Sequence, residues 1–379
     1  MQYLNYDRTK IVWDGVSPVN KTFLVAPMAL KASLMVFNNN GNLLLQKATD
    51  GAPSHFIQLD DLSGYSYFAG KLHAGGQSNE IKEYRANGLY TIGKFYITDN
   101  KLETKKIIDY IPTAKIPKVI GLHMHGNYVL GDNHYLLQAL SFEDVVINGK
   151  KSYVVNCILQ EQLDGKVIWE WQSIDYPELF EASFDRNEYF CRAVQNKEYA
   201  CDYAHMNSSV FTSDKKYLYL SFKHIGIVKI NYLTKEIIWI LGPRTAENMN
   251  FPKETPIFAN QHDIHLIDDN KFYFWDNEHL SYTELTIVDN KVANYKTFKC
   301  SDNWSIAVMG NAIKASDNIL DVCFGWRRPY TPKNYALPII SEFNLETGEK
   351  LLDITIKDWS PELANMMYQV NRGVNIYED

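Results

Sequence analysis

The feature that most constrains this chain of 379 residues is a hairpin pattern that recurs along it. Each copy has a short apolar stretch, a polar turn rich in Asp and Asn, and a strongly apolar strand. Asn, Asp and Gly adopt turn dihedrals readily while the flanking apolar runs pair, so the pattern is typical of β-hairpins. The copies lie at 33–46, 125–140, 205–222, 262–277 and 309–324.

A second pattern, a turn followed by an apolar strand, recurs downstream of the hairpins at 163–171, 233–242 and 345–354. A hairpin and this second pattern together make a unit of about four strands, and roughly six such units fit the chain. The least regular unit lies around 65–76. Because a radial array of four-stranded sheets is a β-propeller, we expect an all-β, six-bladed β-propeller that occupies 1–379 as a single domain.

Two β-sandwich domains are the alternative architecture. They predict a linker with a shift in composition near the middle of the chain, and no such shift is visible. Aromatic residues make up 13% of the chain, with 25 Tyr and 8 Trp, and aromatic residues favour strands. We therefore favour the propeller.

The charge and hydropathy of the chain bear on its partners and location. The formal net charge is −7 and no long basic run occurs, so neither a nucleic acid nor an anionic membrane is indicated as a partner. No apolar run reaches the roughly 18 residues of a membrane helix. The first residues lack the features of a signal peptide, which favours a cytoplasmic protein; removal of a signal would instead indicate a periplasmic or secreted one. A homo-oligomer stays open.

The five cysteines include no CxxC pair, so a zinc ribbon or a thioredoxin-like site is not indicated. Cys191 and Cys201 are candidates for a disulfide in an oxidising compartment. Reduced thiols are the favoured interpretation, and the pairing stays open.

Three histidines occupy one position of the repeat. His125, His205 and His262 each begin a hairpin copy, whereas Met309 begins the next copy. In a propeller the innermost strands of the blades run beside a central channel. We therefore expect these three side chains to face one another near the axis.

The remaining histidines fit the repeat less well. His123 lies two residues before His125, and an offset of two keeps a side chain on one face of a strand, so His123 is a further candidate for the channel. His265 lies three residues after His262 and is expected to pack between sheets. Polar packing is the favoured interpretation for the others: His55, His73, His134, His224 and His279.

Clustered imidazoles support two kinds of chemistry. Zinc binds three histidines plus water, whereas neutral imidazole is a nucleophile and a proton carrier near neutral pH. Asn207 lies two residues after His205, and Lys223 follows the strand that pairs with it. Amide donors and a cation beside imidazoles favour an oxyanion over a metal cation.

Three segments carry a family resemblance. Residues 202–242 contain Asp-aromatic-x-His-x-Asn-Ser and Ile-x-Trp-x-Leu-Gly, and residues 260–278 contain Gln-His-Asp followed by a strand that ends in Asp-Asn. A weaker segment follows at 309–326. The chain resembles the arylsulfotransferase family over about 118–355, and the ordered His-x-Asn and Gln-His-Asp motifs are its most specific part.

The resemblance implies a six-bladed propeller that moves a sulfuryl group from an aryl sulfate donor to a phenolic acceptor with ping-pong kinetics. It implies no nucleotide donor, no cofactor and no metal. His262 becomes the nucleophile that carries the group as sulfohistidine, and His205 becomes an acid or base and a sulfate ligand. Asn207 becomes an oxygen ligand, while His125, with His123 as the alternative, takes the place of the first site histidine.

Two positions depart from the family pattern. Lys223 stands where the family has Arg, and lysine lacks the planar fork that binds oxyanions bidentately. Gly126 stands where an acidic residue is common. The rival interpretations are a binding propeller without catalysis, a metal-dependent hydrolase or lyase that uses His125, His205 and His262, and a protein scaffold.

Other side chains have structural interpretations that we favour. Asp263 follows His262 directly and would point to the opposite face of a regular strand. Trp275, Trp304 and Trp326 fit packing between blades, with stacking on an aryl substrate as the alternative. Three arginines fit solvated loops, with anion binding as the alternative: Arg244, Arg327 and Arg328.

Overall fold

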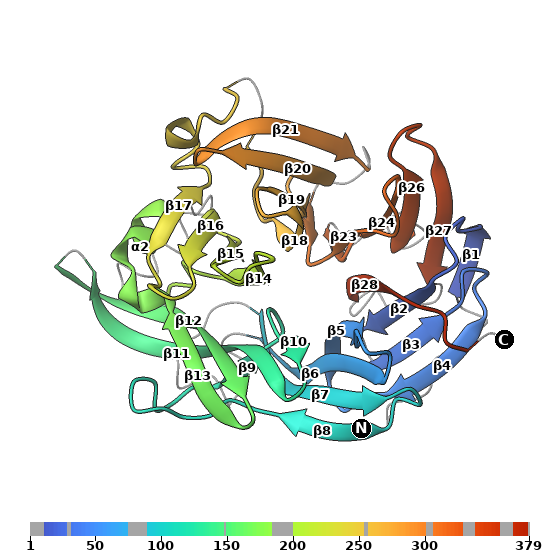
Figure 1. Cartoon of the computed structure of the whole chain (residues 1–379), viewed down its shortest axis with the longest axis horizontal. Helices are drawn as coiled ribbons and strands as arrows, with labels where there is room; N and C mark the ends of the chain where they lie inside the picture. Colours follow the sequence, from blue (N-terminus) through green and yellow to red (C-terminus); the bar gives the residue numbers. More distant parts are fainter. Residues whose placement is uncertain are drawn as a thin grey trace.

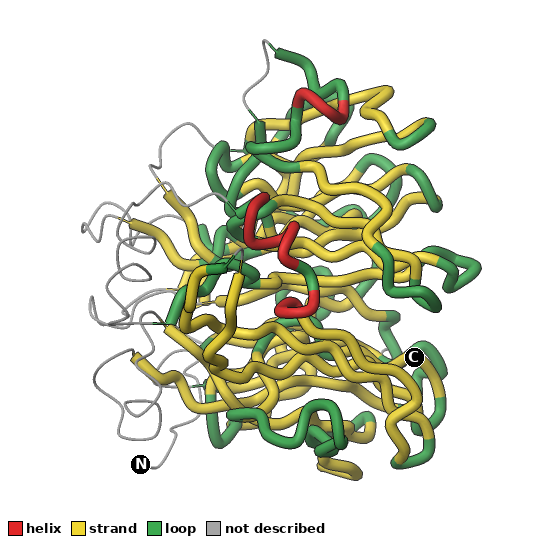
Figure 2. The backbone as a smooth tube through the Cα atoms, turned by 90° about the vertical axis from the view of Figure 1, so that its left-hand side faces the viewer, coloured by secondary structure: helices red, strands yellow, loops and turns green. Residues whose placement is uncertain are grey.

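The protein is an all-β propeller arrangement of sheets around a centre (Figure 1). The structure is a computed structural model. It describes residues 11–28, 32–74, 89–147, 149–183, 200–253, 257–300, 306–328, 338–356 and 367–377. Seen from the side, the strands of neighbouring sheets are stacked along the molecule (Figure 2). The all-β propeller part of the predicted fold class is thereby confirmed.

Four sheets are separate blades of four or five strands. One consists of β28 (Met367–Gly373), β2 (Thr22–Pro27), β3 (Ser33–Phe37) and β4 (Leu43–Ala48). A second blade consists of β14 (Met206–Phe211), β15 (Tyr217–Phe222), β16 (Gly226–Asn231) and β17 (Ile237–Leu241). A third consists of β18 (His262–Asp268), β19 (Lys271–Asp276), β20 (Ser281–Val288) and β21 (Lys291–Lys299). The five-stranded blade is β23 (Asn311–Lys314), β24 (Ile319–Cys323), β26 (Ile340–Asn344), β27 (Lys350–Ile356) and β1 (Ile11–Gly15).

The predicted count of six separate blades is wrong, because the strands from β5 to β13 form one nine-stranded sheet. The short strand β9 pairs with both β7 and β11 and so joins what would otherwise be two sheets. The strands of the nine-stranded sheet are β5 (Ala52–Gln58), β6 (Gly64–Ala74), β7 (Leu89–Asp99), β8 (Thr104–Ile108), β9 (Gly121–His123), β10 (Tyr128–Gly131), β11 (His134–Ile147), β12 (Lys150–Leu163) and β13 (Lys166–Gln172).

The turn before the outer strand shows why the repeat is visible in the sequence. At Asn231 the side-chain oxygen accepts hydrogen bonds from two backbone N–H groups, and Lys235 then takes a left-handed φ of 63°. Asn344 does the same, and Gly348 follows with a φ of 74°. The Asx turn and left-handed residue that reverse the chain are therefore encoded locally.

Strands from the two ends of the described chain both take part in the ring of sheets. The C-terminal strand β28 pairs with β2, and the N-terminal strand β1 pairs with β27. The guanidinium of Arg372 on β28 donates to the buried carboxylates of Asp321 on β24 and Glu342 on β26. Backbone pairing and a buried ion network thus join the first and last blades.

Aromatic and aliphatic side chains fill the spaces between sheets. Trp171 on β13 is buried and packs against Phe222 of the next blade and Tyr176. The remaining elements are short: η2 (Ser173–Asp175), α2 (Pro177–Ala182), η3 (Glu247–Met249), β22 (Ile306–Val308) and β25 (Trp326–Arg328). Among the described residues no helix is long and apolar enough to span a membrane.

Candidate functional site

The His205 hairpin lies at the inner end of its blade, since Figure 1 places β14 beside the centre. The backbone N–H of Lys223 donates to the His205 carbonyl at 2.8 Å and closes the hairpin mouth. A β-bulge between Met206 and Ser208 leaves Asn207 outside the regular pairing. The buried Asn207 amide donates to the Gln261 carbonyl at 2.7 Å. Asn207 therefore anchors the residue that precedes His262.

His123 is the last residue of β9, and His125 lies in the bend that follows this strand. The buried Asn127 amide donates to the carbonyls of both histidines, at 2.6 and 3.1 Å. Gly126 has a φ of 66°, and a Cβ there would lie 2.8 Å from Gln138 Oε1. This backbone conformation favours the glycine that stands here.

His262 begins β18 and pairs with Trp275, but a bulge follows it at once. Asp263 has a φ of 56°, so the regular alternation expected at this position does not apply. Its carboxylate accepts hydrogen bonds from Asn311 on β23 at 2.9 Å and from Gln369 on β28 at 2.9 Å. Asp263 thus ties the start of β18 to the inner strands of two other blades.

The four candidate histidines lie together. The ring centroid of His125 is 4.7 Å from that of His123, 5.3 Å from His205 and 5.5 Å from His262. His123 and His205 are 5.6 Å apart. The Nε2 atoms of His205 and His125 are 3.3 Å apart. Inner strands of three sheets therefore bring four imidazoles into one compact group, called here the histidine cluster.

Burial governs protonation in the histidine cluster. It lowers the pKa of His123 to about 3, and the neighbouring His205 adds to the effect. It lowers the pKa of His262 to about 3, with His205 and then Lys223 contributing further. For His125 burial and the other imidazoles keep the pKa well below its ordinary value. These three rings are neutral at physiological pH, so each offers a lone pair and an N–H donor.

A carboxylate lies on the other side of His205. Asp202 Oδ2 is 2.6 Å from His205 Nδ1. Burial alone would raise the Asp202 pKa, but His205, His224 and Lys223 outweigh it and lower that pKa to about 2. Asp202 is therefore ionised, and the charge of Lys223 acts on both Asp202 and His262. The site combines neutral imidazoles, one cation and one anion.

Three histidines outside the cluster have their own partners. His134 Nε2 lies 2.5 Å from Glu161, and His279 Nδ1 lies 2.6 Å from Asp276. His265 contacts Asp263 at 2.8 Å and stacks on Tyr273 with centroids 5.0 Å apart. These contacts agree with the packing interpretation from the sequence.

The sequence analysis did not single out His55 and Asp202 as site residues. His55 is buried on β5 in a bulge with a φ of 50°, edge-on to Tyr128. Its charge would be felt by His123, His125 and His262. The segment Ala-Pro-Ser-His lacks the hairpin pattern, whereas Asp202 stands in the Asp-aromatic-x-His motif, and its spacing to His205 was a usable signal.

The tryptophan and arginine side chains named in the sequence analysis have structural contacts of their own where the structure describes them. Trp275 is fully buried, donates to Asn277 and meets the Phe324 ring edge-on, so it packs between blades. Arg244 donates to the Glu181 carbonyl at 3.0 Å. Some candidates lie outside the described residues or side chains: His73, Cys191, Trp304, Trp326, Arg327 and Arg328.

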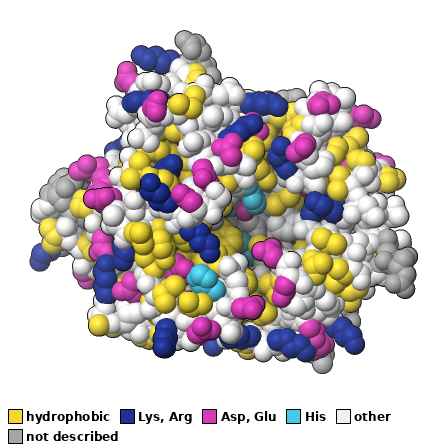
Figure 3. Space-filling view, in the orientation of Figure 1, with side chains coloured by type: hydrophobic (Ala, Val, Ile, Leu, Met, Phe, Trp, Pro, Cys, Tyr) yellow, Lys and Arg dark blue, Asp and Glu magenta, His cyan; other side chains and the backbone are white. Residues whose placement is uncertain are grey.

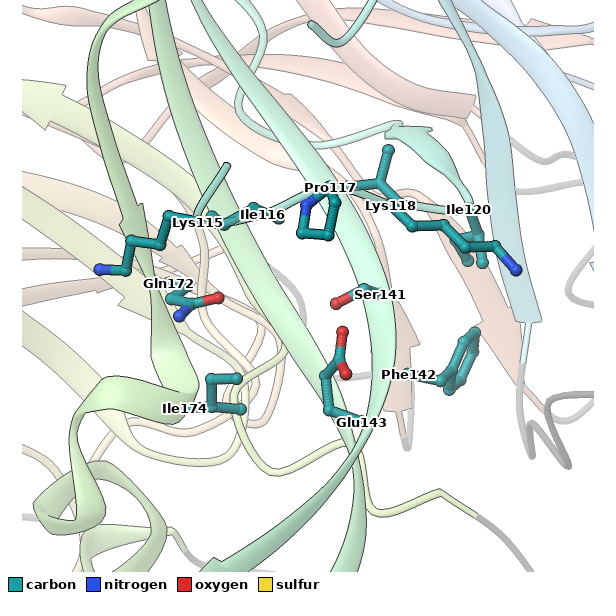
Figure 4. Close-up of a pocket in the computed structure, with 11 residues that line it drawn as sticks. Lys115, Ile116, Pro117, Lys118, Ile120, Ser141, Phe142, Glu143, Gln172 and Ile174 are labelled. Carbon is teal, nitrogen blue, oxygen red and sulfur yellow. The ribbon is translucent and has the colours of Figure 1, made fainter. Parts of the chain in front are cut away.

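Two further features describe the site's surroundings. Figure 3 shows a hollow near the middle of one face, with a histidine side chain at its edge. A separate cavity of about 310 Å³ lies between Lys118, Phe142 and Ile174 and is not lined by the histidine cluster (Figure 4). Within the described part of the chain, no group of three or more His, Cys, Asp or Glu has an arrangement suited to a metal ion.

Comparison with known proteins gives one family and one fold. The model of the family described as Arylsulfotransferase (ASST) matches residues 71–309. A protein of unknown function from Bacteroides caccae is similar in structure, with 8% identity, a TM-score of 0.54, and coverage of 93% of this chain and 98% of that one. The WD40 β-propeller domain of Doa1 has 8% identity, a TM-score of 0.45, and coverage of 94% and 88%. No curated protein sequence matches the chain significantly.

Proposed function

Because the chain belongs to the arylsulfotransferase family, we propose that it moves a sulfuryl group from an aryl sulfate to a phenol through a sulfohistidine at His262. The observation that carries this proposal is the histidine cluster, in which four imidazoles from three sheets lie with ring centroids 4.7 to 5.6 Å apart.

In the first half-reaction a lone pair of neutral His262 attacks sulfur. The new N–S bond forms as the bond between sulfur and the aryl oxygen breaks, and the electron pair leaves on the phenolate. Protonated His205 gives a proton to that oxygen. In the second half-reaction neutral His205 takes the proton of the acceptor phenol, whose oxygen attacks the sulfohistidine and releases His262.

The surrounding groups are suited to the sulfuryl oxygens. His123 and His125 are neutral and buried, so their N–H groups can donate to an oxyanion where water does not compete. Lys223 supplies the cation that the family takes from Arg. Each donor aimed at charge that develops in the transition state contributes on the order of 3 kcal/mol.

Asn207 has a positioning role in this proposal, besides that of the oxygen ligand that the family resemblance implies. One of the two N–H groups of its amide donates to the Gln261 carbonyl. We therefore assign Asn207 to holding the backbone of the nucleophile, since a nucleophile must be fixed to within fractions of an ångström of the reacting sulfur.

The test is to incubate the protein with p-nitrophenyl sulfate, with and without phenol, and to follow nitrophenolate and intact mass. We expect phenol-dependent turnover and, without phenol, a sulfuryl adduct that disappears in His262→Ala. His134→Ala, which removes a histidine paired with Glu161 outside the cluster, is the control and should keep both. The absence of turnover and of adduct with several donors would refute the proposal.

A further inference from the structure

Asp202 is held rigidly on both sides. The backbone N–H of Cys201 donates to the Tyr153 carbonyl, and the N–H of Val155 donates to the Cys201 carbonyl, each at 2.9 Å. On the other side the buried ring of Tyr203 packs edge-on against Phe180 of α2, with centroids 5.2 Å apart. The carboxylate is therefore fixed by β12 and α2, two elements that belong to the preceding part of the chain.

The contact between Asp202 and His205 decides which His205 nitrogen can exchange a proton. An ionised carboxylate only accepts hydrogen bonds, so Nδ1 of His205 must carry the proton in the 2.6 Å contact with Asp202. Neutral His205 then has its lone pair on Nε2, the atom that lies 3.3 Å from His125 Nε2. The nitrogen directed into the histidine cluster is thus the one that gains and loses the proton.

The other acidic side chain beside the cluster is already engaged. Asp263 accepts hydrogen bonds from Asn311, Gln369 and His265. It therefore serves the packing of three inner strands, and the imidazole that it binds is His265. Asp202, by contrast, binds a histidine of the cluster directly.

We propose that Asp202 is the positioning residue of His205: it fixes the ring with Nδ1 protonated and directs Nε2 at the oxygen that leaves or attacks sulfur. The catalytic half of this inference rests on the proposed sulfuryl transfer, whereas the tautomer and ring orientation do not. Asp202 also stabilises the imidazolium that forms when Nε2 takes a proton, in the way that a buried carboxylate supports a catalytic histidine.

The first test reads the tautomer without any substrate. Protonated and unprotonated ring nitrogens resonate in separate ¹⁵N ranges, and the His205 signals can be assigned from His205→Gln. We expect neutral His205 to carry its proton on Nδ1 in the wild-type protein and to lose this preference in Asp202→Asn. A wild-type His205 with the proton on Nε2 would overturn the inference, whatever the enzymatic activity.

The second test separates positioning from folding by the choice of donor. A general acid matters most for a poor leaving group. We expect Asp202→Asn to slow sulfuryl transfer from an alkyl-substituted phenyl sulfate by about 100-fold or more, and from p-nitrophenyl sulfate by less than about 10-fold. Equal losses with both donors would indicate a purely structural role and refute the inference.

Glu161→Gln is the matched control, because Glu161 is also a buried carboxylate that contacts a histidine, at 2.5 Å, but outside the cluster. It should change neither the leaving-group dependence nor the His205 signals. If the wild-type protein transfers no sulfuryl group, the proposed function fails, and the ¹⁵N measurement still decides the inference about Asp202.

Discussion

The ion network that closes the ring contains more acid than base. Arg372 faces two buried carboxylates, Asp321 and Glu342, and Glu342 also accepts a hydrogen bond from Ser17 at 2.7 Å. With both acids ionised the network would hold one uncompensated negative charge. Burial and then the charge of Asp321 raise the pKa of Glu342 from 4.5 to about 7. A proton is therefore taken up here on folding.

The raised pKa of Glu342 decides how the stability of the protein changes with pH. Because the folded-state pKa is raised, the stabilisation is full below pH 4.5 and is lost as the pH rises through about 7. The difference between the unfolded and the folded pKa of Glu342 contributes about 3 kcal/mol to the free energy of unfolding, since one pKa unit is worth about 1.4 kcal/mol. Between about pH 5.5 and 8 roughly 2 kcal/mol of this amount is lost.

We therefore predict that Glu342→Gln removes this pH dependence. The amide can still bind Ser17 and Arg372, and Arg372 keeps a neutral pair with Asp321. The variant should gain about 2 kcal/mol over the wild type between pH 5.5 and 8, measured as the difference in free energy of unfolding in urea at each pH.

The comparison is a double difference, so titrations elsewhere in the protein cancel. Glu346→Gln on the exposed turn after β26 is the control and should show no pH-dependent gain. A Glu342→Gln variant whose free energy of unfolding differs from that of the wild type by the same amount at pH 5.5 and at pH 8 would refute the reasoning.

The remaining predictions concern the site. Lys223→Met should slow nitrophenolate release from p-nitrophenyl sulfate by about 100-fold, whereas Lys223→Arg should keep at least the wild-type rate, because the planar fork binds oxyanions well; equal loss in both would argue against an oxyanion role. Asn207→Ala should lower the free energy of unfolding by about 1 to 3 kcal/mol, since the buried Gln261 carbonyl loses its donor; an unchanged urea midpoint would contradict this. The pKa of His262, lowered by burial to about 3, predicts that the sulfuryl adduct forms at undiminished rate down to about pH 4; a decline centred near pH 6.5 would count against His262 as a buried nucleophile.

The sequence predicts the parts of this fold that are encoded locally. The turns after Asn231 and Asn344 are built from neighbouring residues, so the repeat pattern in the sequence predicts them. The blade count depends instead on whether distant strands pair. Strand β9 has three residues, and no local pattern indicates that it pairs with two neighbours at once. The predicted six separate blades failed at this long-range step.

The histidine cluster was predictable for a related reason. Equivalent repeat positions on the inner strands lie near the same axis, so the shared position of His125, His205 and His262 is enough to predict that they lie together. His55 could not be placed in this way, because its blade lacks the repeat motif and a bulge with a left-handed residue turns the strand there. Bulges re-aim side chains and break the alternation on which strand reasoning depends.

The bulges also explain how the site is made rigid. His55, Asn207 and Asp263 each stand at an irregular step of an inner strand. At such a step the regular ladder of backbone hydrogen bonds is interrupted. Side chains there form hydrogen bonds with backbone groups and with one another instead. Asn207 binds the Gln261 carbonyl, and Asp263 binds Asn311 and Gln369. Asn207 and Asp263, which the alternation rule places poorly, therefore fix one inner strand to the next and help to hold the histidine cluster in place.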